Sequence, residues 1–236
     1  HPHDRIERAL EGVIGACDAA QGPPLLGAAI RHAVFPGGAR IRPQLCVAVA
    51  RACNEDDPAL SDAAASAVEL LHCASLVHDD LPCFDDAPTR RGVPSVHRAY
   101  GERLAVLAGD ALIVLAFQAL ATGSSRTPQR LPALVAAIAQ GVGMPAGIVA
   151  GQGWECESHV ALADYQRAKT GALFAAAAMA GALAAGRDAR PWRAFGEGLG
   201  EAYQVADDIR DVVADPAVIG KPVGRDRALG RPNAAR

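Results

Sequence analysis

Apolar residues recur along this chain at the three- and four-residue spacing that is typical of amphipathic helices. The first such stretch places Ile6, Leu10 and Ile14 on one face. Polar or Gly/Pro-rich breaks separate further helical stretches, which we expect at 25–34, 41–53, 61–80, 96–122, 130–150, 162–187 and 190–214. Ser61 is the expected N-cap of the long stretch that it begins. Alternation of period two never persists, so we predict no strand and interpret residues 1–236 as a single all-α domain.

Composition supports helices and limits the possible partners. Half of the residues are hydrophobic but only 4% are aromatic, and alanine supplies much of the apolar fraction. Such chains favour closely packed helices. The formal net charge of -3 argues against a strongly basic nucleic-acid binder, so we expect no nucleic-acid partner. The six cysteines form no CxxC pair, which indicates reduced, mostly buried thiols in a cytoplasmic protein.

The longest stretch without a charge, 131–154, raises the question of a membrane span. It contains Pro132, Pro145 and five glycines, so its tendency to insert into a bilayer is weak. We predict a buried Ala/Gly-rich helix here and no stable membrane insertion.

A first cluster of aspartates, Asp79, Asp80, Asp85 and Asp86, ends the long helical stretch. On a regular helix Asp85 would point away from Asp79. Pro82 disfavours helical geometry in the residue before it and allows the chain to curl back. We therefore expect Asp79 and Asp85 to act together.

A second cluster, Asp207, Asp208 and Asp211, lies inside a helical stretch. Residues four apart share a helix face, so Asp207 and Asp211 project together. Carboxylates this dense repel one another unless cations lie between them, and Mg²⁺ takes carboxylate, phosphate and water oxygens. One such cluster is as readily a solvated acidic face, but two of them near arginine and lysine indicate a magnesium site.

Cations next to glycines accompany both clusters. Arg90 and Arg91 follow the first cluster, Lys169 interrupts an apolar helical stretch, and Lys221 and Arg225 follow the second. Each cation taken alone is more simply a solvated surface residue, but arginine forks suit diphosphate oxygens. The chain has neither a Walker nor a GxGxxG pattern, so a nucleotide is not the expected ligand. Together with the apolar helices, these groups indicate a magnesium-held diphosphate on an apolar tail.

The motifs that carry this chemistry are GGARIRP, LLHCASLVHDDLPCFDD, RRG, KTGALF, and YQVADDIRDV followed by GKPVGRD. On these motifs, residues 25–236 resemble the trans-isoprenyl diphosphate synthases, in particular the bacterial geranylgeranyl and farnesyl diphosphate synthases. The resemblance implies an all-α bundle around a deep central cavity, a homodimer, and three Mg²⁺ ions per active site. The implied reaction is the head-to-tail condensation of isopentenyl diphosphate with an allylic diphosphate.

The resemblance also implies roles for individual residues. Magnesium would be ligated by the aspartates of both clusters: Asp79, Asp80, Asp85, Asp207, Asp208 and Asp211. The allylic diphosphate would be held by a second set: Arg90, Lys169, Thr170, Gln204 and Lys221. Isopentenyl diphosphate would be held by a third: Arg42, His72 and Arg91. The catalytic residues among them would be Asp79, Asp80, Asp85, Lys169 and Asp207.

Three positions depart from the family's pattern. Ala39 stands where most members carry a lysine for isopentenyl diphosphate, and Arg40 could compensate. Glu155 follows Gln152 where an aspartate is usual, which keeps the carboxylate, and Arg225 replaces a lysine with its charge retained. The resemblance further implies C-terminal helices, after residue 236, that usually complete the cavity.

Product length is expected to depend on Ala74 and Ser75, which precede Asp79 by about 6 to 7.5 Å along a helix. The resemblance implies that an aromatic residue there closes the pocket at fifteen carbons, whereas two small residues leave it open. We therefore expect geranylgeranyl diphosphate, with farnesyl diphosphate as the alternative. Close helix packing is a second explanation for the small residues. The sequence does not determine the preferred allylic starter.

Three other functions fit these motifs less well. A class I terpene cyclase would normally carry a second motif with Asn and Ser ligands, whereas the second cluster here is DDxxD. A non-catalytic regulatory subunit of a prenyl diphosphate synthase tends to lose one cluster, and both are present. A purely structural helical protein would have no reason to bury so many aspartates.

Overall fold

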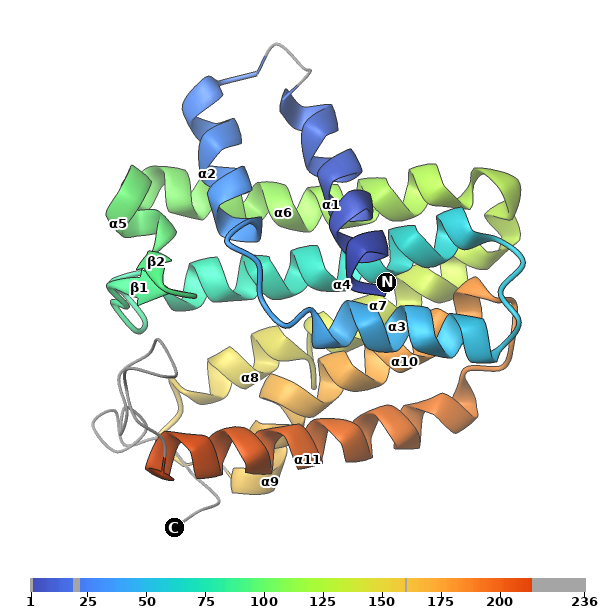
Figure 1. Ribbon diagram of the computed structural model, residues 1–236. Coiled ribbons are helices and arrows are strands. Elements are labelled where there is room, and N and C mark those ends of the chain that lie inside the picture. Colours follow the sequence, from blue (N-terminus) through green and yellow to red (C-terminus); the bar gives the residue numbers. More distant parts are fainter. Residues whose placement is uncertain (1, 19–21, 160, 214–236) are drawn as a thin grey trace.

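The computed structural model describes residues 2–18, 22–159 and 161–213, and nearly all of their secondary structure is helical (Figure 1). Two long helices, α4 (Pro58–Asp79) and α6 (Glu102–Gly123), pack side by side through the molecule. Below them in Figure 1 lie α3 (Ile41–Ala52), α7 (Leu131–Val142), α10 (Ala172–Ala184) and α11 (Arg190–Val213). The first two helices, α1 (Pro2–Asp18) and α2 (Pro24–Val34), cross α4 and α6 at a steep angle. The predicted all-α fold is confirmed.

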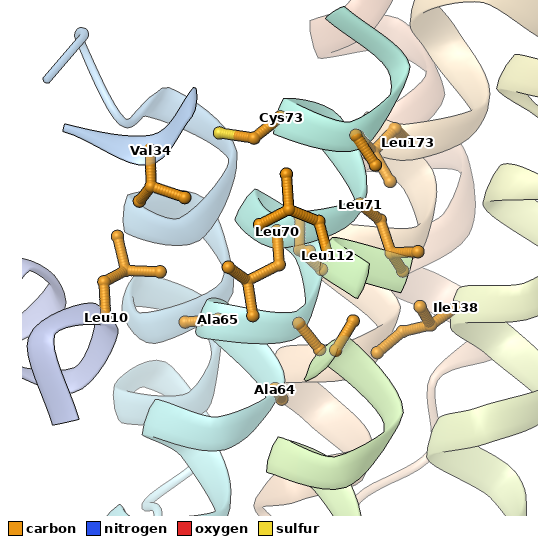
Figure 2. Packing of buried hydrophobic residues seen from close by; sticks show 14 of the residues in the cluster. Leu10, Val34, Ala64, Ala65, Leu70, Leu71, Cys73, Leu112, Ile138 and Leu173 are labelled. Atoms are coloured by element: carbon orange, nitrogen blue, oxygen red, sulfur yellow. The ribbon is translucent and has the colours of Figure 1, made fainter. Parts of the chain in front are cut away.

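Apolar side chains from several helices meet around α4. Leu70 of α4, Leu112 of α6 and Leu173 of α10 are fully buried, and Figure 2 shows them within one cluster. The sequence of α10 is apolar on every side, as expected of a helix enclosed by its neighbours. An added Cβ at Gly181 would lie 2.3 Å from the carbonyl oxygen of Cys46 in α3. Glycine at this position therefore allows α10 to approach α3 closely enough to seal the core.

The long helix α4 begins earlier than expected and has a different cap. It begins at Pro58, and the side chain of Asp57 accepts a hydrogen bond from the N–H of Leu60 at 3.5 Å. Ser61 lies inside the first turn, where its Oγ donates to the Asp57 carbonyl at 3.3 Å. The prediction of Ser61 as the N-cap was wrong because Asp57 and Pro58 together supply the cap and the start.

Three of the expected helical stretches are interrupted. The segment 131–154, expected as one buried helix, is divided after α7 because Pro145 cannot donate to a helix, and α8 (Ile148–Trp154) follows. Gly101, with a φ of 87°, separates α5 (Val96–Tyr100) from α6. A π-helical turn at Arg167–Gly171 separates α9 (Leu162–Gln166) from α10. Two 3₁₀ turns, Ser124–Arg126 and Pro128–Arg130, connect α6 to α7.

The prediction of no strand was wrong at one place. β1 (Thr89–Arg90) and β2 (Val93–Pro94) form a short antiparallel hairpin. Its two-residue turn consists of Arg91, with a φ of 53°, and Gly92, with a φ of 81°. Both angles are in the left-handed region that the tightest hairpin turns require. Strands of two residues are too short to show an alternation in the sequence, yet this turn fixes where Arg90 and Arg91 lie.

The long apolar helices and the burial of the cysteines can be compared with the predictions of no membrane insertion and of mostly buried thiols. Within the part of the chain that the structure describes, two helical segments are long and apolar enough to cross a membrane, Pro58–Asp79 and Glu102–Arg126. The first is the central core helix, and 78% of its apolar window is buried, against 39% for the second. Among the cysteines whose side chains are described, Cys46 and Cys73 are buried whereas three are not, so the prediction of mostly buried thiols was wrong.

Candidate active site

The first aspartate cluster lies where α4 ends. Asp79 and Asp80 are buried, although both are carboxylates. The backbone N–H of Asp85 donates to the carbonyl of Asp79 at 3.0 Å, so the chain returns toward the helix end after Pro82. Two acidic side chains are therefore held at one buried corner of the bundle, and Asp85 follows on the returning segment.

Asp80 is paired with the first arginine of the hairpin. Nε of Arg90 donates to both carboxylate oxygens of Asp80 at 3.1 Å, and Nη2 donates to the same group. Burial raises the pKa of Asp80, and the hydrogen bonds from Arg90 act in the opposite direction. Burial also works against the charge of Arg90, but Asp80 outweighs it and raises the pKa of the guanidinium. The pair brings a strong cation next to the acidic cluster.

Asp79 contacts a second cationic group that comes from the π-helical turn. Nζ of Lys169 lies 3.7 Å from Oδ2 of Asp79 and forms an ion pair with Glu155. Gln152 donates from Nε2 to Oδ1 of Asp79 at 3.3 Å. The hydroxyl of Tyr165 donates to Oε1 of Glu155 at 2.5 Å. Glu155 stands where the family's pattern has an aspartate, and its carboxylate holds Lys169 beside Asp79.

Sequence reasoning assigned no role in the site to Gln152, Glu155 or Tyr165. The spacing of Gln152 and Glu155 was the available signal, since they stand three apart where the family's pattern has a glutamine followed by an aspartate. Tyr165 gave no comparable signal. Its contact with Glu155 depends on how α9 returns after α8.

The second aspartate cluster begins on α11. Asp207 lines the same cavity as Arg90, and Oγ1 of Thr170 donates to Oε1 of Gln204 at 2.5 Å, one turn before Asp207. The side chains of Asp208 and Asp211, and all of Lys221 and Arg225, lie outside the described part of the structure. Their expected roles therefore stay predictions.

A cavity of about 380 Å³ separates α4 and the hairpin from α11. Its lining is rich in cations and polar groups: Gly38, Ala39, Arg40, Ile41, Arg42, Glu69, His72, Leu76, Thr89, Arg90, Arg91, Thr170, Tyr203, Gln204 and Asp207. The three residues that the resemblance assigns to isopentenyl diphosphate all lie on this cavity. Residues from five separate segments of the chain meet there.

Arg42 has an unusual environment in this wall. Its Cζ lies 4.7 Å from the ring centre of Phe174 and 5.7 Å from that of Tyr203. Its Nε is buried, and no described residue accepts a hydrogen bond from it. Burial lowers the pKa of Arg42, and the nearby Arg91 adds to this effect. A buried donor without an acceptor is costly, so this wall favours an anionic ligand that supplies one.

Arg40 does not take the place of the lysine that Ala39 replaces. All three guanidinium nitrogens of Arg40 are engaged: Nε with Glu7 at 2.7 Å, Nη1 with Glu69 at 2.7 Å, and Nη2 with the carbonyl of Val34 at 2.8 Å. Its side chain is fully buried. The expectation that Arg40 could compensate for Ala39 was therefore wrong, because this cation stabilises the fold around the cavity.

The two residues linked to product length have different surroundings. Ala74 is part of the buried core, whereas Ser75 is half-buried. Oγ of Ser75 donates to the carbonyl of His72 at 2.8 Å, and its own carbonyl accepts from Gln152 at 3.1 Å. The backbone of Ser75 is thus hydrogen-bonded to Gln152, whose side chain also donates to Asp79.

The donors present suit Mg²⁺ more than a metal held by protein alone. Within the described residues, no three His, Cys, Asp or Glu side chains lie close enough together to bind a metal ion by themselves. Mg²⁺ is commonly held by one or two carboxylates together with substrate phosphates and water. Asp207 lines the cation-rich cavity, and buried Asp80 is hydrogen-bonded to Arg90 of the same lining, so these carboxylates fit that mode of binding.

An all-α bundle that places aspartates from two helices beside an arginine-lined cavity defines the isoprenoid-synthase class of helical proteins. Comparison with known sequences identifies the family within this class. The profile of the polyprenyl synthetase family matches residues 23–235, and the chain belongs to this family of prenyltransferases. The expected family is therefore confirmed.

The chain is similar to relatives of known name and structure. It is 58% identical to a geranylgeranyl diphosphate synthase of Cereibacter sphaeroides, over 98% of this chain and 81% of the relative. It is 53% identical to one of Rhodobacter capsulatus, over 98% and 80%. The apo structure of an FPP/GFPP synthase from Zymomonas mobilis matches with a TM-score of 0.81 at 31% identity, covering 97% of this chain and 85% of that one.

Proposed function

We propose that this protein catalyses the Mg²⁺-dependent condensation of isopentenyl diphosphate with an allylic diphosphate and forms geranylgeranyl diphosphate. The observation that carries the proposal is the buried Nε of Arg42, for which the described residues provide no hydrogen-bond acceptor, in a cavity that Arg90 and Arg91 also line. The diphosphate groups of the two substrates would supply acceptors to these guanidinium groups. The names of the two bacterial relatives support the same reaction and product.

We propose the following division of roles. Magnesium, with three ions per active site, would be held by Asp79, Asp80, Asp85, Asp207, Asp208 and Asp211. The allylic diphosphate would be held by Arg90, Lys169, Thr170, Gln204 and Lys221. Isopentenyl diphosphate would be held by Arg42, His72 and Arg91. The lining of the described cavity supports the third set most directly.

Bound Mg²⁺ would neutralise charge on the departing diphosphate. The chain's own residues would do the rest. Lys169, 3.7 Å from Asp79, and Arg90, paired with Asp80, are placed to share the charge of the leaving group. The tightly packed core around α4 would exclude water, which would otherwise quench an allylic cation. The released diphosphate would take the proton lost in forming the new double bond, so no protein base is assigned.

The proposed twenty-carbon product rests on the small side chains of Ala74 and Ser75. These two residues lie five and four residues before Asp79 on α4. Farnesyl diphosphate remains the alternative product. The name of the Zymomonas mobilis protein includes FPP, so this fold is compatible with more than one product length.

We also propose that the protein is a homodimer, and α6 supports this. Leu107 and Val114 of α6 are 50% and 57% exposed, and Asp110 is exposed between them. An apolar face with a charge at its centre suits a second protein surface more than lipid. A homodimer would cover this helix, consistent with a cytoplasmic, single-domain enzyme without membrane insertion.

Incubation of the purified protein with Mg²⁺, isopentenyl diphosphate and farnesyl diphosphate tests the proposal. Chromatography of the dephosphorylated products should show a twenty-carbon alcohol, and the Asp79→Asn variant should give none. Elongation of a ten-carbon starter that stops at fifteen carbons would favour farnesyl diphosphate synthase. Absence of any elongated alcohol from folded protein would favour a non-catalytic regulatory subunit.

A further inference from the structure

Glu69 is a buried carboxylate at the wall of the cavity. It lies on α4, one turn before Cys73, and is only 2% exposed. Its Oε1 accepts hydrogen bonds from Nη1 of Arg40 at 2.7 Å and from Nη2 of Arg91 at 3.4 Å. Sγ of Cys73 donates to the same oxygen at 3.9 Å. A buried carboxylate is costly unless it is paired, and here two arginines from distant segments pair with it.

The first of these arginines fixes the glycine-rich loop. Arg40 has a left-handed backbone, with a φ of 47°, directly before α3. Besides Glu69, its guanidinium binds Glu7 of α1 and the carbonyl of Val34 at the end of α2. The loop from Pro36 to Ala39 is therefore anchored to three helices through one side chain.

The second arginine is wedged between Glu69 and this loop. A Cβ added to Gly38 would lie 3.0 Å from Cζ of Arg91, so the guanidinium packs directly on the backbone of Gly38. The backbone of Arg91 is also left-handed, which places its side chain at the tip of a strained turn. Without a partner, a long side chain in such a turn would sample many rotamers.

We propose that Glu69 is a positioning residue for isopentenyl diphosphate, which it serves by orienting Arg91 directly and the Gly38 loop through Arg40. The inference rests on the proposed function of the cavity. Glu69 would not contact the substrate. It would present the guanidinium of Arg91 in one orientation, so that less entropy is lost when the diphosphate binds.

The Glu69→Gln variant keeps the size of the side chain and removes its charge. Loss of a hydrogen bond to a charged group should raise the KM for isopentenyl diphosphate by about tenfold or more. The KM for the allylic diphosphate and kcat should change little, because Lys169 and Asp79 are untouched. Glu69→Asp, which keeps the charge, should restore part of the lost affinity.

Glu55→Gln is the matched control. Glu55 binds Arg5 of α1 through two hydrogen bonds, of 2.7 and 3.0 Å, and is not part of the cavity lining. This variant should lower the melting temperature and leave both KM values unchanged. If Glu69 had a purely structural role, Glu69→Gln would also lower the melting temperature and leave both KM values unchanged, or it would raise both KM values equally. Either result would overturn the proposal.

Gly38→Ala provides a test that leaves Glu69 in place. The added methyl would lie 3.0 Å from Cζ of Arg91 and shift its guanidinium, and the φ of 144° at this position would strain the loop that Arg91 packs on. The same selective rise in the KM for isopentenyl diphosphate is therefore expected. An unchanged KM in Gly38→Ala would contradict the inference even if Glu69→Gln failed to fold. The wild-type enzyme separates the two proposals: if it forms no elongated product, the proposed function fails before these variants are compared.

Discussion

Nη1 of Arg42 lies 3.4 Å from Nε2 of His72, which joins α3 to α4 at the cavity wall. Burial lowers the pKa of His72 well below its usual value, and the positive charges of Arg42, Arg91, Arg90 and Arg40 lower it further. A neutral imidazole can accept a hydrogen bond from Arg42. Two groups expected to bind the same diphosphate thus avoid repelling each other.

This pKa predicts how stability depends on pH. In the unfolded chain the pKa of His72 is about 6.5, so only the unfolded state binds the proton just below that pH, and the free energy of unfolding falls as the pH decreases. His72→Gln should lose less stability than the wild type between about pH 7.5 and about pH 5.5 in urea unfolding. His159→Gln, at an exposed position, is the control. Equal losses in wild type and His72→Gln would contradict the prediction.

Replacement of Arg42 by lysine should weaken binding of isopentenyl diphosphate. Lysine keeps the charge but loses the planar group that stacks on Phe174 and the Nε donor. We expect the KM for isopentenyl diphosphate to rise about tenfold, as for the loss of a hydrogen bond to a charged group. Arg31→Lys is the control, because Arg31 stacks on Phe35 at the surface. Steady-state kinetics with the allylic substrate saturating would show the difference.

Mg²⁺ and inorganic pyrophosphate should stabilise the protein together. Ligand at about one hundred times Kd adds about 2.7 kcal/mol, which for a chain of this size shifts Tm by several degrees. EDTA should reverse the shift, and Asp79→Asn should reduce it. Differential scanning fluorimetry measures both. The same shift with pyrophosphate in EDTA would mean that the metal is not needed for binding.

Ala74→Tyr should shorten the product. Ala74 is 2% exposed, so the larger side chain should also cost about 1–3 kcal/mol through overpacking. Ser75→Phe, at the half-buried neighbour, should shorten the product with a smaller loss of stability. Chromatography of the dephosphorylated alcohols and urea unfolding would test the two effects. Twenty-carbon output from both variants would count against this pocket.

Leu107→Glu on α6 should weaken the proposed dimer. The charge would be buried against a second copy of the same helix, which costs several kcal/mol when unpaired. Size-exclusion chromatography with light scattering should show a monomer at concentrations where the wild type is a dimer. Leu25→Glu is the control, because Leu25 is 65% exposed on α2. A monomeric wild type would refute the proposal directly.

The order of the helices could be predicted from the sequence because a 3.6-residue period is a local property. The interruptions could be anticipated only partly. Pro145 breaks a helix by its own chemistry, but the hairpin at Arg91 is too short for any periodicity to reveal. The residues of the candidate site were nominated by residue type and motif. The structure then placed seven of them on one cavity: Arg42, His72, Arg90, Arg91, Thr170, Gln204 and Asp207.

The sequence by itself determined an all-α chain with two aspartate clusters and a set of cations suited to diphosphate, because period and residue type can be read along the chain. Only the tertiary structure decided what each cation does. Arg40 and Arg42 are two residues apart, yet Arg40 is fully engaged with Glu7 and Glu69 whereas Arg42 keeps a buried donor without a described acceptor. The reason is physical: Glu7 of α1 and Glu69 of α4, distant in sequence, are hydrogen-bonded to the guanidinium of Arg40 and not to Nε of Arg42.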